Sequence, residues 1–371
     1  MTMDQDYISH TQLTALIWVG VLAPVAGLFP SLTLPEAGKG AWLAPVAAIP
    51  LVLMSGWLLN RLSEEQGLAL SIRARLGPVF GTLILLIYMV WGEVLLSLQL
   101  QLSARRLLSS GYRDGKLWFF LLAIAAMVLW IGVGKLSAFA RAGQIFLAIL
   151  LTTGAVVLLL SMFQVKPARV LPLWKEDVIP VLRSALPAAG VLGWGIYGAF
   201  FLGQVKPEKN RGRWYGIFWG VGGCLLLALS QWIILGNLGP ALAARLNNPF
   251  FALAKSVGVK GAFQRVESVI ASLWTLADLT MASILLLALR TMTKAIAPKV
   301  KEWMAAAVGL GLATALAMTL FSSPSVEIWN RTLVPWVNII LGLGMPCLLT
   351  AYITFIKNSK GEGTSCGKNP S

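Results

Sequence analysis

Glu93 is the first candidate for chemistry, because it lies within a long apolar stretch at residues 79–100. Ser97 and Gln101 follow at four-residue steps, which places the three side chains on one face of a helix. Ionisable groups inside an apolar helix bundle are costly, and they often mark ligand, ion or proton sites. We therefore consider Glu93 and Ser97 as candidates for binding a ligand amine or a proton. The alternative is a structural hub of hydrogen bonds between helices.

Asp278 is the second acidic candidate, in an apolar stretch that also contains Thr275. A carboxylate at such depth can bind a cation or a proton, or it can pair with another helix. Glu267 lies eleven residues earlier, which is about three helical turns and therefore the same face. Because Glu267 stands beside Arg265 near the expected start of this helix, we interpret it as a partner of the helix dipole. Asp278 and Thr275 remain candidates for an ion or proton site or for a structural contact.

Two apolar segments contain helix-breaking residues near their middle. In residues 12–30, Pro24 removes a backbone donor and Ala26-Gly27 follows it. In residues 187–204, four glycines occur within nine residues, which makes a poor continuous helix. Breaks at equivalent positions of two halves indicate an inverted-repeat transporter, in which freed amides and carbonyls bind carboxylates, amines or cations. The alternative is that Gly and Pro serve close packing between helices.

The candidate ligand site at the two breaks combines backbone segments with two aromatic side chains. Together with Glu93 and Ser97, it comprises Pro24, Ala26, Gly27, Gly190, Gly193, Trp194, Gly195 and Tyr197. Asn338, near the C-terminal end of the chain, is interpreted instead as a hydrogen-bonding residue between helices.

Catalytic and metal chemistry find little support in the sequence. His10 is the only histidine, and the three cysteines have no metal-site spacing. Glu267 and Asp278 are the one pair of carboxylates on a shared face, and they are too far apart to act on one substrate atom. We therefore predict that the protein is not an enzyme and uses no metal or cofactor.

The composition identifies the solvent of this chain as lipid. Of 371 residues, 57% are hydrophobic and 12% are charged, against about 25% charged residues in soluble proteins. The net charge of +15 would suggest nucleic acid in a soluble protein. Here Lys and Arg cluster between apolar runs, so we interpret them as topology signals that face the lipid bilayer, and we predict no nucleic-acid partner.

Runs of about 20 apolar residues are long enough to cross the hydrocarbon layer. The sequence predicts ten of them, at 12–30, 41–59, 79–100, 117–134, 143–163, 187–204, 214–235, 266–289, 303–321 and 333–356. Residues 60–77 and 240–262 are expected to contain short amphipathic helices. We thus expect an all-α polytopic membrane protein with one transmembrane domain at 1–356. Its two repeats would span about 8–163 and 187–356, followed by a short cytoplasmic tail at 357–371.

Orientation follows from the distribution of Lys and Arg. Loops 60–78, 135–142, 205–213 and 290–302 and the C-terminal tail are rich in them, whereas loops 31–40 and 322–332 contain one each. Both termini are therefore predicted to be cytoplasmic, which agrees with an even number of spans. Segment 101–116 is an exception on the opposite side, since it contains four basic residues.

Several short motifs, in order along nearly the whole chain, resemble the spore germination protein family, the GerAB-type B subunit of germinant receptors. They are Ile8–Leu13, similar to the family's opening Ile-Ser-x-x-Gln; Pro35, Gly38 and Trp42; Phe263–Ser268 followed by Trp274; and Trp336–Pro346. The resemblance implies the amino acid–polyamine–organocation transporter fold, which is LeuT-like, with five-plus-five inverted repeats and broken helices one and six.

The resemblance also implies a function. The chain would be the subunit that binds a small germinant, often an amino acid, in the inner membrane of a bacterial endospore, with a membrane-anchored A subunit and a lipoprotein C subunit as partners. The alternative hypothesis is a secondary transporter that couples amino-acid uptake to protons or sodium. A shared fold does not separate the two.

Overall fold

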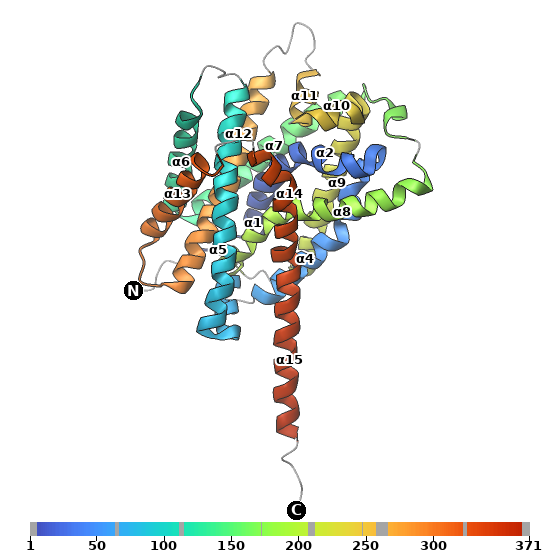
Figure 1. Ribbon diagram of the computed structural model, residues 1–371. Coiled ribbons are helices and arrows are strands. Elements are labelled where there is room, and N and C mark those ends of the chain that lie inside the picture. Colours follow the sequence, from blue (N-terminus) through green and yellow to red (C-terminus); the bar gives the residue numbers. More distant parts are fainter. Residues whose placement is uncertain are drawn as a thin grey trace, which may run out of the picture.

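The computed structural model describes residues 6–63, 67–110, 115–171, 173–206, 212–246, 248–256, 266–321 and 325–365. Within these ranges the chain is helical, apart from connecting segments and one parallel bridge between Ile8 and Val205. Figure 1 shows the helices gathered in one bundle, from which α15 (Met345–Ser365) projects.

The described residues of the first half of the chain form nine helical elements. They are α1 (His10–Ile17), η1 (Trp18–Leu22), α2 (Ala23–Ala37), η2 (Gly38–Leu43), α3 (Ala44–Ala47), α4 (Ile49–Ser63), α5 (Leu68–Ser110), α6 (Leu117–Val133) and α7 (Leu136–Met162). Element η1 is a π-helical turn, and η2 is a 3₁₀ helix.

Two short 3₁₀ turns, η3 (Pro167–Arg169) and η4 (Lys175–Asp177), lead into the second half. It contains α8 (Val178–Leu192), η5 (Gly193–Gln204), α9 (Gly212–Leu238), α10 (Pro240–Arg245), α11 (Pro249–Ser256), α12 (Val266–Ile296), α13 (Glu302–Met318), α14 (Ser325–Ile339), η6 (Ile340–Gly344) and α15. Element η5 is 3₁₀-helical and η6 is π-helical.

Helices occupy all ten ranges predicted as spans. In the described part of the chain, seven regions are long and apolar enough to cross a membrane, namely 24–63, 68–108, 136–162, 175–204, 215–238, 272–296 and 326–355. Three shorter apolar helices, His10–Leu22, Leu117–Val133 and Glu302–Met318, coincide with the other predicted spans. The chain is therefore an all-helical, multi-pass integral membrane protein, and the inverted repeat stays a prediction.

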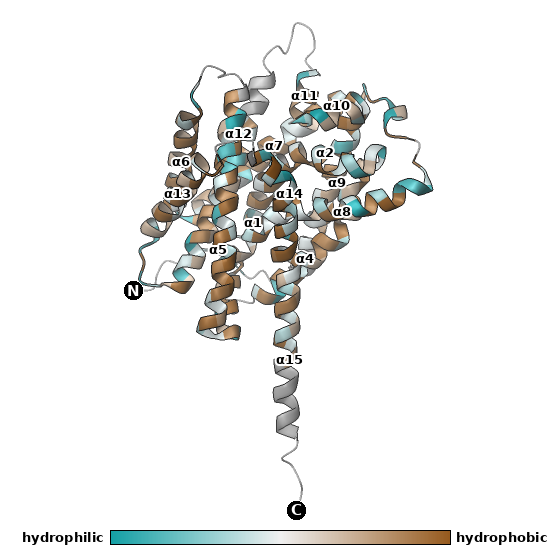
Figure 2. Cartoon of the chain, in the orientation of Figure 1, coloured by the Kyte–Doolittle hydropathy of each residue, from teal (hydrophilic) through white to brown (hydrophobic). Residues whose placement is uncertain are grey.

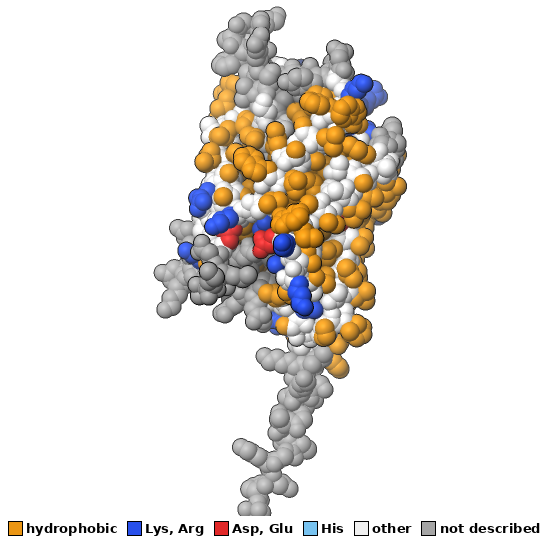
Figure 3. Space-filling view, turned by 90° about the vertical axis from the view of Figure 1, so that its left-hand side faces the viewer, with side chains coloured by type: hydrophobic (Ala, Val, Ile, Leu, Met, Phe, Trp, Pro, Cys, Tyr) orange, Lys and Arg blue, Asp and Glu red, His pale blue; other side chains and the backbone are white. Residues whose placement is uncertain are grey.

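Apolar side chains cover the outside of the bundle. Figure 2 shows hydrophobic residues along most of the helices, and Figure 3 shows them over much of one face, with most of the visible Lys and Arg side chains in its lower part. Trp130 on α6 is 82% exposed and Val308 on α13 is 70% exposed. Such surfaces are unfavourable in water and suit contact with lipid tails.

The start of α5 is a separate short helix that packs back onto the span. Gly77 has φ of +80°, which only glycine adopts readily, and Pro78 then begins a new helical direction. A Cβ atom at Gly81 would lie 2.7 Å from the Cα atom of Arg73, so the two pieces are in close contact. The short helices expected between spans are present at 68–76, in α10 and in α11. At the other end, α15 continues to Ser365, into the segment expected to be a polar tail.

Helix α12 is the centre of the bundle and packs along α5, with α6, α13, η1 and η5 around it. Most of its middle is buried, including Met281, Ile284 and Leu286. A Cβ atom at Gly20 in η1 would lie 3.3 Å from the Cα atom of Met281, so this glycine lets the π-helical turn approach α12 closely. The close approach fixes the break of the first span against the helix that contains Asp278.

Candidate functional site

The first predicted span is irregular immediately before the predicted break, whereas Pro24, Ala26 and Gly27 themselves lie in the regular helix α2. Ser9 begins α1 with a capping box, in which Gln12 exchanges hydrogen bonds with it. After Ile17 the chain forms the π-helical turn η1, and α2 then begins with Pro24 in its first turn. Proline is tolerated there because the first amides of a helix have no intrahelical partner. Short π-helical turns are rare overall, but where they occur they are often at functional sites.

The sixth predicted span changes helix type within its glycine-rich segment. Helix α8 ends at Leu192, and a 3₁₀ helix continues from Gly193 to Gln204. A run of twelve residues is long for this type, since most 3₁₀ segments have about 3–4 residues. The backbone amide of Gly193 is shared among carbonyls of the preceding turn. Both predicted irregularities are therefore present, as changes of helical geometry.

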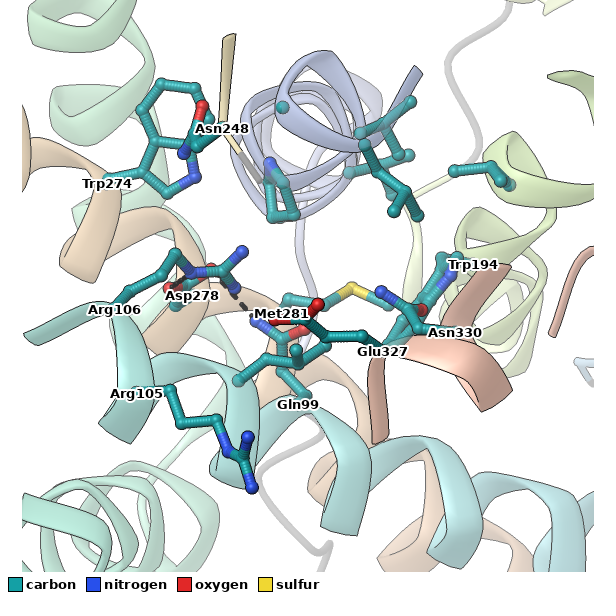
Figure 4. Close-up of a pocket in the computed structure, with 18 of the residues that line it drawn as sticks. Gln99, Arg105, Arg106, Trp194, Asn248, Trp274, Asp278, Met281, Glu327 and Asn330 are labelled. Carbon is teal, nitrogen blue, oxygen red and sulfur yellow. Dashed lines mark hydrogen bonds and ion pairs between the residues drawn. The ribbon is translucent and has the colours of Figure 1, made fainter. Parts of the chain in front are cut away.

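A cavity of about 520 Å³ lies beside both irregular segments, which is within the range of about 300–1,000 Å³ for small-molecule sites. Its wall is formed by η1 and α2, the outer part of α5, the end of α8 with Trp194, α11, α12 and α14. In Figure 4, Trp274 and Asn248 lie at one side of this cavity, and Trp194 and Asn330 lie at the other. In the predicted topology it lies toward the non-cytoplasmic loops.

Five of the residues predicted from sequence line this cavity, namely Pro24, Gly27, Trp194, Thr275 and Asp278. A Cβ atom at Gly27 would lie 3.1 Å from Oδ1 of Asn248, so the absence of a side chain leaves room for α11 to approach. The structure thus brings together Pro24 and Gly27 of the first break and Trp194 of the second with the polar segment of α12.

The other predicted residues lie outside the cavity wall: Ala26, Glu93, Ser97, Gly190, Gly193, Gly195 and Tyr197. Their contacts show close packing. A Cβ atom at Gly190 would lie 2.1 Å from the carbonyl oxygen of Pro335, and one at Gly193 would lie 2.9 Å from Cβ of Asn338. A Cβ atom at Gly195 would lie 3.5 Å from Cγ2 of Ile17. The glycines of α8 and η5 therefore let α14 and α1 approach, in line with the packing alternative.

Ala26 instead lines a second, apolar cavity of about 290 Å³ between η1, α7, α9 and α12. Ser97 is fully buried, and its hydroxyl donates to the carbonyl of Val94 within α5 at 2.8 Å. These positions stay candidates from sequence only.

Asp278 is held by α5 in a dense set of hydrogen bonds. Its carboxylate accepts from Nε of Arg106 at 2.8 Å, from Nη2 of Arg106 at 2.6 Å and from Nε2 of Gln99 at 3.0 Å. The side chain of Asp278 is 2% exposed, whereas that of Arg106 is 29% exposed at the cavity (Figure 4). Of the roles considered for Asp278, the structure shows pairing with another helix. The side chain of Glu267 lies outside the described residues.

Among the described residues, the buried polar atoms of the cavity wall without a hydrogen-bond partner include Nε1 of Trp274 and Oδ1 of Asn330, both on residues more than nine-tenths buried. An indole N–H can only donate, and an amide oxygen can only accept. Buried polar groups are almost always satisfied, so each such atom needs an explanation. Both residues line the cavity, on opposite sides of it in Figure 4.

Several wall residues were missed from sequence: Gln99, Arg105, Arg106, Asn248, Glu327, Asn330 and Arg331. Most fall in ranges assigned to loops, because the apolar runs end before them. One signal was available, since Gln99 and Arg106 are seven residues apart, about two turns, and hence on one face of a continued helix. These charged residues lie within the ends of helices. Because they lower the mean hydropathy there, the predicted span ends before it reaches them.

A second polar network, outside the cavity wall, joins α5 and α14 to α8, η5 and η6. Asn338 on α14 accepts from Nε1 of Trp91 at 2.8 Å and donates to the carbonyl of Gly190 at 3.0 Å. Tyr197 donates to the carbonyl of Tyr88 at 2.9 Å, and Tyr88 donates to a carbonyl of η6 at 2.6 Å. The interpretation of Asn338 as an interhelical residue is confirmed, and Tyr197 has a structural bond instead of a place in the cavity.

Among the residues that the structure describes, no three His, Cys, Asp or Glu side chains form a group that could hold a metal ion. The cavity wall contains arginines, carboxylates, amides and indoles, which are groups that can form hydrogen bonds and charge pairs.

Comparison with known proteins gives a consistent result. The sequence profile of a family described as "Spore germination protein" matches residues 7–326. No curated protein matches the chain. The fold is similar to that of MhsT in complex with L-phenylalanine, with a TM-score of 0.66, 15% identity, and 91% of this chain and 88% of that chain covered.

A mutant of the manganese transporter of Eremococcus coleocola is also similar, with a TM-score of 0.50, 13% identity, and 97% of this chain and 89% of that chain covered. These likenesses show a LeuT-like fold, as the sequence resemblance implied. Family and fold both belong to receptors and transporters and not to enzymes.

Proposed function

Because the chain belongs to the spore germination protein family, we propose that it is the B subunit of a nutrient-germinant receptor and binds a small germinant in the cavity between α2, α5, α12 and α14. The germinant class is an amino acid or a similar small polar molecule. The family match supports the receptor context. The similar structure supports the class of ligand, since that of MhsT was determined in complex with L-phenylalanine.

The observation that carries this proposal is the pair of unsatisfied polar atoms in the cavity wall. Trp274 offers an indole N–H and Asn330 offers an amide oxygen, and both are buried without a protein partner. A ligand with an acceptor for the first and a donor for the second would satisfy both. An amino acid has these two functions in its carboxylate and its ammonium group.

The charges of the wall fit a zwitterionic ligand. Three arginines, Arg105, Arg106 and Arg331, and two carboxylates, Asp278 and Glu327, contribute to it. Groups of both signs thus line the cavity, as a ligand with two opposite charges requires.

Binding would act as a signal by favouring one of two arrangements of the helices. A ligand shifts an equilibrium only by its difference in affinity for the two states. The cavity touches η1, Trp194 and α14 at once, so its filling favours the arrangement in which these segments are close. The receptor would then act with A and C subunits in the inner membrane of the endospore, with both termini of this chain in the cytoplasm.

The proposal is tested by spores in which the chain has the substitution Trp274→Phe. Loss of a hydrogen bond to a charged group, here the ligand carboxylate, costs about 1.5–3 kcal/mol, which corresponds to about a 12- to 150-fold rise in the germinant concentration for half-maximal response. The matched control is Trp130→Phe, since Trp130 is 82% exposed on the outside of α6. Germination would be measured against a panel of single amino acids, with protein levels checked by immunoblot.

A selective loss of response to one nutrient in Trp274→Phe, at a normal protein level, supports the site. An identical response of both variants to every nutrient would show that Trp274 does not contact a germinant. Asn330→Leu then tests the opposite wall, because it removes the amide acceptor and retains the volume.

A secondary transporter is the second candidate, and the similarity to transporters favours it. Proteoliposomes that contain the purified chain distinguish the two functions. Uptake of radiolabelled L-phenylalanine, leucine or alanine above that of empty liposomes, in a sodium or proton gradient, supports transport. Binding of the same amino acids without uptake supports a receptor.

A further inference from the structure

Glu93 lies in the membrane-spanning part of α5, on a different face from the cavity. Gln99, which reaches Asp278 at the cavity, is six residues further along, and six residues rotate a helix by about 240°. Glu93 instead faces α13, where its Oε1 atom would lie 3.1 Å from a Cβ atom at Gly309. The carboxyl group is therefore placed in the interface of α5 and α13.

The surroundings of this carboxyl group are apolar. Its Oε2 atom is buried and has no hydrogen-bond partner. Gly309, which faces it, also packs near the side chain of Leu286 on α12. Gly92 packs against the ring of Tyr197 on the adjacent side. No ion pair within the described ranges includes Glu93.

The charged and titratable groups on the surrounding elements have other partners. On α12, Asp278 is bound by Arg106, Arg290 donates to the carbonyls of Gly132 and Gly134, and Lys294 donates to backbone carbonyls after the helix. Glu302, the acidic residue of α13, lies 3.7 Å from Arg290. Tyr88 and Tyr197 each donate to backbone carbonyls, and α6 contains no titratable residue.

We propose that Glu93 is a proton-binding site at the interface of α5 and α13. An ionised carboxylate without a partner in an apolar interior is strongly unfavourable, and proteins neutralise such groups instead. Taking up one proton from water converts the carboxylate into a neutral carboxylic acid, and release returns that proton to water. A bound metal cation is the poorer solution, because hard cations need about six oxygen ligands and this interface offers one carboxyl group.

Proton binding at this place couples charge to helix packing. In the arrangement seen here, α13 covers the carboxyl group and the neutral form fits. If α13 moves away from α5 and water reaches Glu93, the ionised form is favoured. A rearrangement of these helices during signalling or transport would then take up or release one proton at Glu93. The proton site does not depend on which molecule fills the cavity.

Infrared spectroscopy of the purified full-length protein in lipid nanodiscs tests the proposal. An exposed glutamate has a pKa of about 4.3, so about 1 in 500 of such groups is protonated at pH 7. We expect a carboxylic acid C=O band at pH 7 in the wild type, lost in Glu93→Gln and retained in the control Glu302→Gln. Absence of the band in the wild type, or an unchanged band in Glu93→Gln, would overturn the proposal.

A second measurement needs no variant. Dicyclohexylcarbodiimide adds to protonated carboxylic acids in apolar surroundings and forms a stable N-acylurea, with the acid proton transferred to the reagent. Mass spectrometry of the wild-type protein, treated in nanodiscs at pH 7, should place the adduct on the peptide with Glu93. Its yield should decrease as the pH is raised. Labelling of Glu302 or Glu327 at an equal or greater yield, without labelling of Glu93, contradicts the proposal.

Discussion

Removing Arg106 should destabilise the bundle more than removing the negative charge of its partner Asp278. Their ion pair joins α5 to α12 through two hydrogen bonds of 2.8 and 2.6 Å. The two sides differ in exposure, because the Asp278 side chain is 2% exposed and that of Arg106 is 29% exposed. A charge that stays buried without its partner is the larger penalty.

The magnitudes follow from this asymmetry. Arg106→Met leaves the carboxylate of Asp278 buried with Gln99 as its remaining partner, and breaking a buried pair in this way costs about 3–5 kcal/mol. Asp278→Asn keeps an amide oxygen that can accept one hydrogen bond, and the guanidinium group reaches the cavity, so about 1–2 kcal/mol is expected. The double variant should be more stable than the sum of the two losses predicts, because neither charge is then left alone.

The assay is the free energy of unfolding of the purified protein in one lipid–detergent mixture, for the wild type, both single variants and the double variant. Equal losses for Arg106→Met and Asp278→Asn would refute the argument from exposure. Strict additivity in the double variant would show that the two side chains are not energetically coupled. Only the second result would mean that the ion pair seen between α5 and α12 is not a stabilising contact.

Two further predictions concern the packing of α8 against α14. Gly190→Ala should destabilise the protein by about 1–3 kcal/mol or more, because the new Cβ atom would clash with the carbonyl oxygen of Pro335. In the control Gly154→Ala, the new Cβ atom meets no other atom within 4 Å, so this variant should be neutral or stabilising. Asn338→Leu should lower the free energy of unfolding by about 1–3 kcal/mol, because it leaves the indole N–H of Trp91 and the carbonyl of Gly190 without their partner. The control Thr332→Val, at an exposed position of α14, should have little effect. The same unfolding assay measures all four variants.

The order and type of the elements could be predicted because the lipid environment leaves few solutions. In hydrocarbon a backbone must satisfy its own hydrogen bonds, so a run of apolar residues is a helix. Each of the ten predicted ranges is helical. The two irregular spans could also be located, since proline and clustered glycines have few other effects in a helix.

The ends of the spans could not be predicted from hydropathy. Residues 101–116 were assigned to a loop, but α5 continues to Ser110 and places Gln101, Arg105 and Arg106 inside the fold. This also weakens the exception in the charge distribution, because Arg106, one of the four basic residues in that segment, is paired with Asp278. A positive charge with an intramolecular partner is a weaker topology signal than a free one.

The division of the polar residues between cavity and packing could not be predicted either. Helical periodicity placed Glu93 and Ser97 on one buried face, but it does not tell which neighbour that face meets. The face of Glu93 meets α13, and the cavity is lined from α5 by residues further along, such as Gln99 and Arg106. The sequence also places Asn330 and Glu327 in a loop, because the apolar run that predicts the last span begins after them, at residue 333.

The cavity and the packing network are connected through short stretches of backbone, which gives the proposed ligand a route to the rest of the bundle. Trp194 faces the cavity, and its neighbour Gly193 packs against Asn338. Asn338 in turn holds Trp91 of α5 and the carbonyl of Gly190. A shift of Trp194 therefore disturbs the contact between η5 and α14. Because closely packed interfaces tend to switch between discrete arrangements, a small displacement at the ligand is converted into a movement of whole helices.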